Sequence, residues 1–256
     1  MLKQPVLEVL SAKIIKTEDT YVLIGELQNV DNVPADVVVN GTLYSATNNK
    51  LASYNVKDQM KHKLLPKEIT SFRINFEEIA WMDAAATKPK TFDPNQFTAA
   101  RIESEPTKFN IQCAGNVATT DLYKGVVLNA LSVKENRLYG VLFNSGLQEV
   151  TIPQLLISYY DKDKKLIWVD HKYIPEGIRP QRKNYFDYKL LSITNTHTIT
   201  EAMDYVFVNG LSNAEISKKV VPDRNIIHHN AKLITVKGVG FSYIKIETNS
   251  YIGSTN

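Results

Sequence analysis

The chain has 256 residues, 43% of them hydrophobic and 22% charged, and its 30 basic and 27 acidic residues give a net charge of +3. These are ordinary values for a globular protein and leave room for two domains of about 100 to 120 residues. There is no dense basic tract of the kind that binds nucleic acid, and no apolar run approaches the ~18 to 20 residues that span a bilayer. Cys113 is the one cysteine, which excludes an intrachain disulfide and a thiolate metal cage.

Two stretches of the chain are approximate copies of each other. Gly25-Glu-Leu-Gln-Asn29 returns 115 residues later as Gly140-Val-Leu-Phe-Asn144. Further matched pairs are Val6–Ser11 with Val127–Ser132, Pro66 with Pro180, and Phe72 with Phe186. A match at several anchors, with length differences confined to polar segments, indicates a duplicated structural unit.

In the first copy, apolar residues alternate with a period of two, which predicts strands. Val37 and Val39 alternate with Val38 and Asn40, and the same spacing continues in Phe72-x-Ile74-x-Phe76. The polar cluster 46–50 between two such runs predicts a hairpin turn. In the run 109–113, alternation places Cys113 on the apolar side, so we expect a buried core thiol rather than a reactive one.

The second copy repeats this pattern. Residues 155, 157 and 159 alternate with 156, 158 and 160, and the cluster Asp161-Lys-Asp-Lys-Lys165 predicts the equivalent hairpin turn. A weaker third echo relates Ala231-Lys-Leu-Ile234 to Ala12-Lys-Ile-Ile15. It is explained either by the start of a third unit or by an unrelated amphipathic hairpin.

These elements predict an all-β protein built of two tandem immunoglobulin-like antiparallel β-sandwiches, with a partial third unit or an extra hairpin at the C-terminus. The expected boundaries are 1–118 for the first sandwich, 119–218 for the second, and 219–256 for a linker and the terminal hairpin. The seam lies near residues 116–121, and so short a linker predicts contact between the two units.

The motif resembles the FxLYD domain, a small immunoglobulin-like module of prokaryotic, mostly envelope-associated proteins. The first unit matches it at Gly25, Asn29, Val37, Val39, Leu43, Tyr44, Leu51, Leu65, Pro66, Glu68 and Phe72. The second unit matches it at Gly140, Asn144, Tyr159, Tyr160, Asp161, Leu166, Pro180 and Phe186. The chain departs from the motif where Ser45 replaces aspartate, Lys67 and Gln181 replace glycine, and Arg179 replaces leucine. The resemblance implies an extracytoplasmic module without catalytic residues.

Chemistry-bearing residues are present, but their spacing does not predict a reactive site. The five histidines are His62, His171, His197, His228 and His229. The adjacent pair would point to opposite faces of a strand and could not share a metal ion. Counting from Asp161, a calcium loop would need glycine and glutamate where Leu166 and Lys172 stand, so a solvated turn is favoured there. We therefore expect no catalytic, metal or cofactor-binding residues and no cofactor.

Aromatic side chains supply the best candidate binding surface. Trp168, Tyr173, Tyr185 and Tyr243 lie in or beside predicted strands, where alternation turns about half of such residues outward. Cross-strand packing of aromatic and β-branched side chains is nevertheless the favoured explanation for most of them. A carbohydrate platform would instead require Trp168 or Trp81 to be exposed beside two coplanar aromatics.

The sequence therefore predicts a non-catalytic spacer and protein-binding scaffold of a bacterial cell-envelope or secreted protein, and not an enzyme. A carbohydrate-binding β-sandwich is the alternative. The expected partner is a protein, within a larger envelope complex, and not nucleic acid. The expected location is the periplasm or cell surface if a signal peptide is missing from the written chain, and the cytoplasm otherwise. The terminal hairpin 231–252 is the element expected to pair edge to edge with a partner strand.

Overall fold

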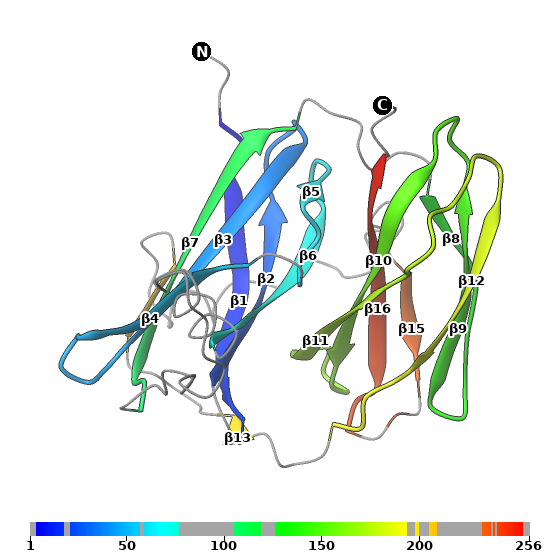
Figure 1. Cartoon of the computed structure of the whole chain (residues 1–256). Coiled ribbons are helices and arrows are strands. Elements are labelled where there is room, and N and C mark those ends of the chain that lie inside the picture. The colour runs from blue at the N-terminus through cyan, green and yellow to red at the C-terminus, as the bar shows by residue number, and fades with distance from the viewer. Residues whose placement is uncertain are drawn as a thin grey trace, which may run out of the picture.

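The computed structural model describes residues 4–17, 21–56, 59–76, 105–118, 126–193, 198–199, 205–208, 232–236, 238 and 240–252. The regular structure in these ranges is β-strand, arranged in four sheets (Figure 1). Pairing is antiparallel throughout, except that β14 runs parallel to β7. The prediction of an all-β, sandwich-like protein is confirmed.

Two of the sheets form what we call the N-terminal sheet pair. One has the order β13 (Thr198–Ile199), β1 (Leu7–Lys16), β2 (Tyr21–Asn29), β6 (Ile69–Asn75). The other has the order β14 (Tyr205–Val208), β7 (Lys108–Val117), β3 (Ala35–Tyr44), β4 (Lys50–Asn55), with β5 (Lys63–Leu64) paired to β3. Alternate residues such as Leu23, Val39 and Phe72 meet between these sheets in a buried core.

The other two sheets form the C-terminal sheet pair. One has the order β12 (Lys183–Lys189), β9 (Arg137–Asn144), β8 (Val126–Lys134), and the other β11 (Leu166–Tyr173), β10 (Val150–Tyr160), β16 (Tyr243–Ile252), β15 (Lys232–Thr235). Their core contains Leu142, Ile157, Tyr159, Phe186 and Ile246. The edge of the Phe241 ring packs against Tyr159, with the centroids 4.9 Å apart.

For 219–256 the sequence leaves two explanations open, the start of a third unit or an extra terminal hairpin, and in the structure β15 and β16 pair as antiparallel neighbours. β16 lies between β10 and β15 and completes the C-terminal sheet pair, in the place that β7 takes beside β3. The short strands β13 and β14 pair with β1 and β7 of the N-terminal sheet pair. Alternation reveals a strand but not its neighbour, because any edge can accept it.

The duplicated motif folds in the same way in both sheet pairs. A Cβ added at Gly25 would lie 2.5 Å from the ring of Phe72, and one added at Gly140 would lie 2.4 Å from the ring of Phe186. Each phenylalanine faces its glycine across a strand pair, so the ring occupies the space that a side chain would need.

The paired asparagines also make equivalent hydrogen bonds. Asn29 Nδ2 donates to the carbonyls of Val33 and Leu64, at 2.7 and 3.2 Å. Asn144 Nδ2 donates to the carbonyls of Gln148 and Ile178, at 2.7 and 2.8 Å. Both side chains are completely buried and hold two loops against the end of a strand.

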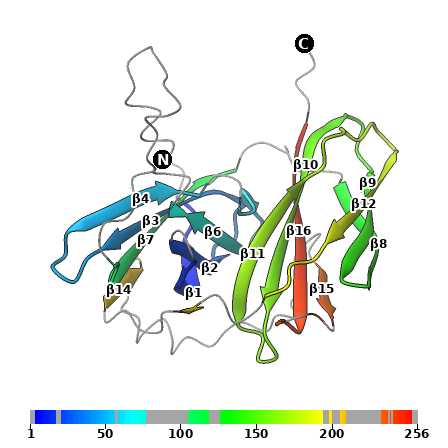
Figure 2. The same ribbon diagram turned by 60° about the horizontal axis from the view of Figure 1, so that its bottom comes forward.

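The two sheet pairs stack face to face into four layers (Figure 1). The outer face of β1–β2–β6 packs against the outer face of β11–β10–β16, and β11 runs beside β2 and β6 (Figure 2). As a result both faces of β10 are buried from Pro153 to Tyr160. The predicted contact between the units is therefore an extensive packing of sheet on sheet.

Candidate functional site

The candidate site is the interface between the two sheet pairs. One end of this interface is apolar. Ile15, Val22 and Ile24 pack against Tyr160, Leu166 and Val169. In β2 the even-numbered residues face this interface, while the odd-numbered residues fill the N-terminal core. Strict alternation thus lets one strand serve two hydrophobic clusters.

Next to this cluster the interface becomes polar, and Tyr160 links the two sheet pairs. Its hydroxyl donates to Glu26 Oε1 at 2.9 Å and lies 3.2 Å from Ser71 Oγ. The other carboxylate oxygen of Glu26 accepts from Ser11 Oγ at 3.2 Å. All of these groups but Ser11 are buried, so each hydrogen bond offsets the desolvation of its partners.

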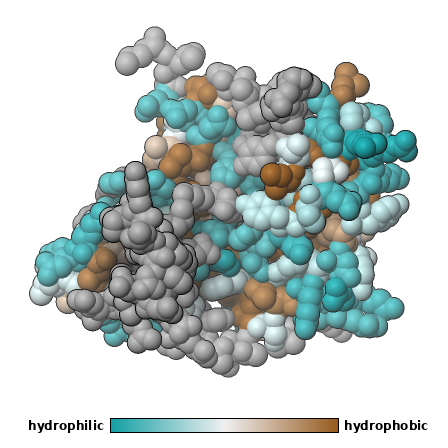
Figure 3. Space-filling model, in the orientation of Figure 1, coloured by the Kyte–Doolittle hydropathy of each residue, from teal (hydrophilic) through white to brown (hydrophobic). Residues whose placement is uncertain are grey.

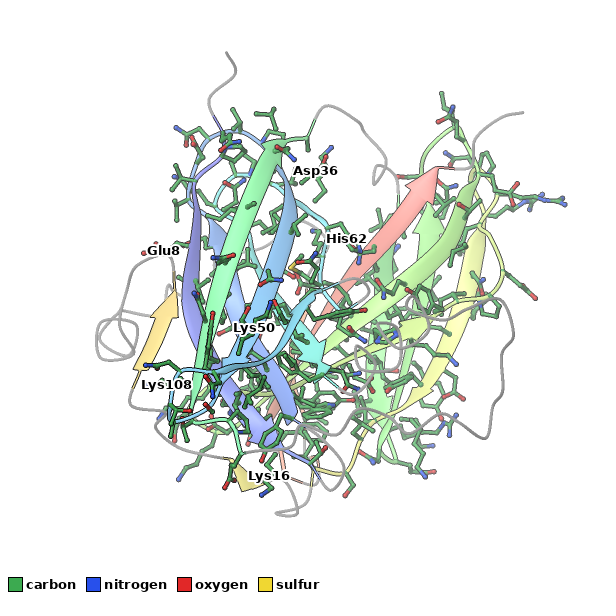
Figure 4. The ribbon with its side chains drawn as sticks, turned by 60° about the vertical axis from the view of Figure 1, so that its left-hand side comes forward. Glu8, Lys16, Asp36, Lys50, His62 and Lys108 are labelled. Carbon is green, nitrogen blue, oxygen red and sulfur yellow. The ribbon has the colours of Figure 1, made fainter. Side chains whose placement is uncertain are left out.

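The strand β16 supplies a row of polar contacts to the N-terminal sheet pair. Asn249 Nδ2 donates to the carbonyl of Met60 and to Gln154 Oε1, both at 2.7 Å, and its Oδ1 accepts from the His62 backbone N–H at 3.2 Å. Figure 4 shows His62 on the side of the N-terminal sheet pair that faces β16. Lys245 Nζ approaches the carbonyl of Ile69 at 3.4 Å. The C-terminal strand therefore fastens the two sheet pairs together.

Two buried ion pairs lie at this part of the interface, one on β16 and one in the N-terminal sheet pair. Lys245 Nζ lies 3.1 Å from Glu247 Oε2, and Lys61 pairs with Glu68. Burial acts to lower the pKa of Lys245, but the neighbouring Glu247, Tyr160 and Glu26 together outweigh it and leave that pKa above its usual value. Burial raises the pKa of Glu68, and Lys61 offsets only part of this rise. Removing one partner of such a pair would leave an uncompensated buried charge.

Arg73 reaches from β6 around the edge of β11. Its Nη1 donates to the Val169 carbonyl at 2.7 Å and lies 3.7 Å from Asp170 Oδ1, while the guanidinium sits 5.2 Å from the centre of the Trp168 ring. Asp170 also accepts from the Tyr188 hydroxyl. The guanidinium thus caps a backbone group on an edge strand that would otherwise be open to another strand.

These contacts hold the two sheet pairs together. Glu26, Glu68 and Asp170 each accept a hydrogen bond from a neighbouring group, and in the described ranges no three His, Cys, Asp or Glu side chains are grouped to hold a metal ion. Cys113 packs against the N-terminal core on the side that the sequence predicts, but it is half-buried rather than fully buried, and burial raises its pKa to about 12. A thiol with so high a pKa is a poor nucleophile at neutral pH.

The polar cluster at Asp161 is a hairpin turn, as predicted. Asp161 Oδ1 accepts from the backbone N–H groups of Asp163 and Lys165, at 2.9 and 2.8 Å. Among the histidines, His62 lies at the interface and His171 lies on β11. The other three, His197, His228 and His229, fall outside the described residues.

The four aromatic residues predicted as a binding surface do not form one surface. Trp168 and Tyr243 are half-buried at the interface, where both pack against its apolar cluster. Tyr173 lies at the end of β11, 38% exposed, with its ring edge-on to His171. Tyr185 is 74% exposed on β12, on the opposite side of the C-terminal sheet pair. Trp81 lies outside the described residues.

The surface itself shows no large apolar area in the view of Figure 3, where hydrophobic residues lie in small groups among hydrophilic ones. None of the described residues forms a helix with the length and hydrophobicity that crossing a bilayer requires.

Sequence reasoning missed the polar residues of the interface, including Glu26, Lys245, Glu247 and Asn249. Polar residues alternating with apolar ones are typical of a solvent-facing side of a strand. The available signal was in β10, where Leu156 and Tyr160 make the second face of the strand partly apolar as well. A strand that is apolar on both faces predicts burial on both.

No protein-family model matches the chain, and no curated protein matches it either. Among solved structures, the chain is similar to red sea bream transglutaminase, with 8% identity and a TM-score of 0.21, over 75% of this chain and 28% of that one. It is also similar to Bacteroides uniformis beta-glucuronidase 2, with 12% identity and a TM-score of 0.17, over 67% of this chain and 22% of that one. The chain thus spans less than a third of either protein, and TM-scores this low give neither similarity any weight.

Proposed function

We propose that the chain is a non-catalytic spacer and protein-binding scaffold, made of two tandem immunoglobulin-like units that resemble the FxLYD domain and belonging to a bacterial cell-envelope or secreted protein. The observation that carries this proposal is the buried joint between the two sheet pairs. A spacer has to hold its ends at a fixed separation, and a sheet-on-sheet joint with buried ion pairs resists bending better than a flexible linker does.

The spacer role is tested by measuring a distance across the joint. Spin labels at Val38→Cys and Lys183→Cys, in a Cys113→Ser background, report on the two outer sheets, because Val38 and Lys183 are both exposed. We expect one narrow distance distribution. The matched control adds Tyr160→Ala, which removes the Glu26 and Ser71 contacts and should broaden the distribution. With the labelled chain diluted into an excess of unlabelled chain, so that only distances within one chain are measured, a broad distribution in the parent protein would rule out a rigid spacer.

The envelope role is tested in the bacterium that carries the gene. The full gene product, tagged at its C-terminus, should fractionate with the envelope and cross-link to a discrete protein partner. Recovery from the cytoplasm alone would contradict this part of the proposal.

A carbohydrate-binding role is the second candidate, supported by exposed aromatics on one sheet. Tyr139 is 37% exposed on β9, and Tyr185 on β12 lies diagonally across from it, since Asp187 is the residue opposite Tyr139. A glycan array with the parent protein and a Tyr185→Ala variant tests it. Binding that the variant loses would support this candidate, and silence of the parent protein would dismiss it.

A further inference from the structure

The joint inside this chain uses two different faces of a repeated unit. The N-terminal sheet pair offers the outer face of β1–β2–β6, which we call the receiving face. The C-terminal sheet pair offers the outer face of β11–β10–β16, which we call the docking face. Because the unit is duplicated, each sheet pair has one face of each kind. Among the described strands, a contact between unlike faces leaves one face of each kind without a sheet packed on it at the two ends of the stack, and such contacts can extend indefinitely.

The unused receiving face is the outer face of β8–β9–β12. The matched pairs Gly25–Phe72 and Gly140–Phe186 align the strands of this face with the strands of the receiving face inside the joint. In this alignment Val141 corresponds to Glu26, and Tyr185 corresponds to Ser71. Val141 and Tyr185 face each other across the strand pair, as Glu26 and Ser71 do. Tyr139 and half-buried Phe143 extend this face along β9. Exposed tyrosines around apolar side chains are typical of surfaces that bind protein.

The unused docking face is the outer face of β4–β3–β7. Hydroxyl and amide side chains form two rows across its three strands, Asn55–Asn40–Gln112 and Ser53–Thr42–Asn110. Asn40 Nδ2 donates to Asn55 Oδ1 at 3.0 Å, and Thr42 Oγ1 lies 2.9 Å from Ser53 Oγ. Charged residues stand at its ends, with Asp36 at one end and Lys50 and Lys108 near the other (Figure 4). The docking face used inside the chain also carries uncharged polar groups, on Gln154, Ser158 and Asn249.

Tyr44 occupies on this face the position that Tyr160 occupies in the joint. The two hairpin turns that follow are equivalent, because Ser45 N–H donates to the Asn49 carbonyl at 2.9 Å and Asp161 N–H to the Lys165 carbonyl at 3.0 Å. In the joint, Tyr160 contacts the cross-strand pair Glu26 and Ser71. The corresponding contact between two chains would place Tyr44 of one copy against Val141 and Tyr185 of another.

We propose that copies of this chain bind one another head to tail, with the docking face of β4–β3–β7 on one copy seated on the receiving face of β8–β9–β12 on the next. The inference rests on the proposed scaffold function and names its partner as a second copy of the chain. The chain already contains one contact between a receiving face and a docking face, in the joint between its two sheet pairs. Growth in this mode is open-ended, and it lengthens the spacer by one chain at a time.

Sedimentation velocity over a concentration series tests the association. The weight-average mass of the parent chain should rise with concentration by roughly twofold or more, as an open heterologous contact requires. Tyr185→Glu on the receiving face and Gln112→Lys on the docking face should each keep the chain monomeric, because both residues are exposed and each variant places a charge in the contact. Leu147→Lys is the matched control, since Leu147 is 90% exposed in the loop between β9 and β10 and should leave association unchanged.

Mixing the two blocked variants separates this arrangement from a symmetric dimer. Each variant keeps one intact face of opposite kind, so the mixture should form one-to-one dimers and nothing larger. A parent chain that stays monomeric at every soluble concentration would overturn the inference, as would a mixture that stays monomeric. The inference would also be overturned if the parent chain bound glycans without self-associating and the Tyr185→Glu variant lost that glycan binding. These outcomes are independent of cell fractionation, so an envelope location with a monomeric chain would leave the proposed function standing.

Discussion

At the scale of single residues, the joint contains two buried serines, of which one has a hydrogen-bond partner for its hydroxyl and the other has none among the described residues. Ser71 Oγ lies 3.2 Å from the Tyr160 hydroxyl, whereas Ser158 Oγ has no hydrogen-bond partner in the described part of the chain. A buried hydroxyl without a partner keeps its desolvation cost. We therefore expect Ser158→Ala to leave the free energy of unfolding unchanged or to raise it by about 1 kcal/mol, and Ser71→Ala to lower it by about 1 kcal/mol.

Urea unfolding followed by tryptophan fluorescence measures both variants, and each serves as the control for the other because both side chains are buried in the same joint. Equal losses of stability would show that Ser158 Oγ has a hydrogen-bond partner after all. A loss in Ser158→Ala alone would contradict the assignment of the Tyr160 contacts.

At the scale of elements, both sheet pairs use a left-handed residue after the matched proline. Lys67 and Gln181 have φ values of 64° and 57°. A side chain at positive φ is strained, and glycine relieves this strain. We expect Gln181→Gly to unfold with a free energy about 1 kcal/mol higher than Gln181→Ala, since both lose the bond to the Ser145 carbonyl.

The control for this prediction is Asp187 in the regular strand β12. There the order should reverse, with Asp187→Ala more stable than Asp187→Gly, because glycine gains no strain relief in an extended strand. Thermal unfolding of the four variants gives both differences. The same order at both positions would show that Gln181 is not strained.

Individual strands were predictable from the sequence, but their neighbours were not. Alternation marks β3, β10 and β12 because each has one face of its strand in a core. The same signal marks the terminal hairpin, yet it cannot show that β16 sits between β10 and β15. Local periodicity depends on one strand, whereas sheet order depends on contacts between residues far apart in the chain.

At the scale of the whole molecule, the four-layer stack was only partly predictable. The duplication and the short seam predict two units in contact, and the structure shows that they share a polar, buried joint. In the sequence, the charged residues of this joint have the spacing of solvent-facing positions. The alternation within a strand identifies its polar side, but it does not show whether another sheet packs on that side. Lys245 and Glu247 in particular are unremarkable in sequence and buried as a pair in the structure.

That pair makes the stability of the whole molecule sensitive to alkaline pH. Burial lowers the pKa of Lys245, but Glu247, with help from Tyr160 and Glu26, holds it above its usual value of 10.5. Below pH 10.5 the lysine is protonated in both the folded and the unfolded chain, so its contribution is fully present. Above that pH the unfolded chain loses the proton first, and the free energy of unfolding falls by up to about 1.4 kcal/mol per pH unit.

Lys245→Arg isolates this contribution, because arginine stays protonated throughout the range. Urea unfolding at a series of pH values from about 9 to about 11.5 should show a steeper loss of stability in the parent chain than in the variant, with tyrosine ionisation common to both. Parallel pH profiles would show that the lysine titrates alike in the folded and unfolded chains. In that case the joint would hold Lys245 in a solvated environment and not in the buried ion pair described above.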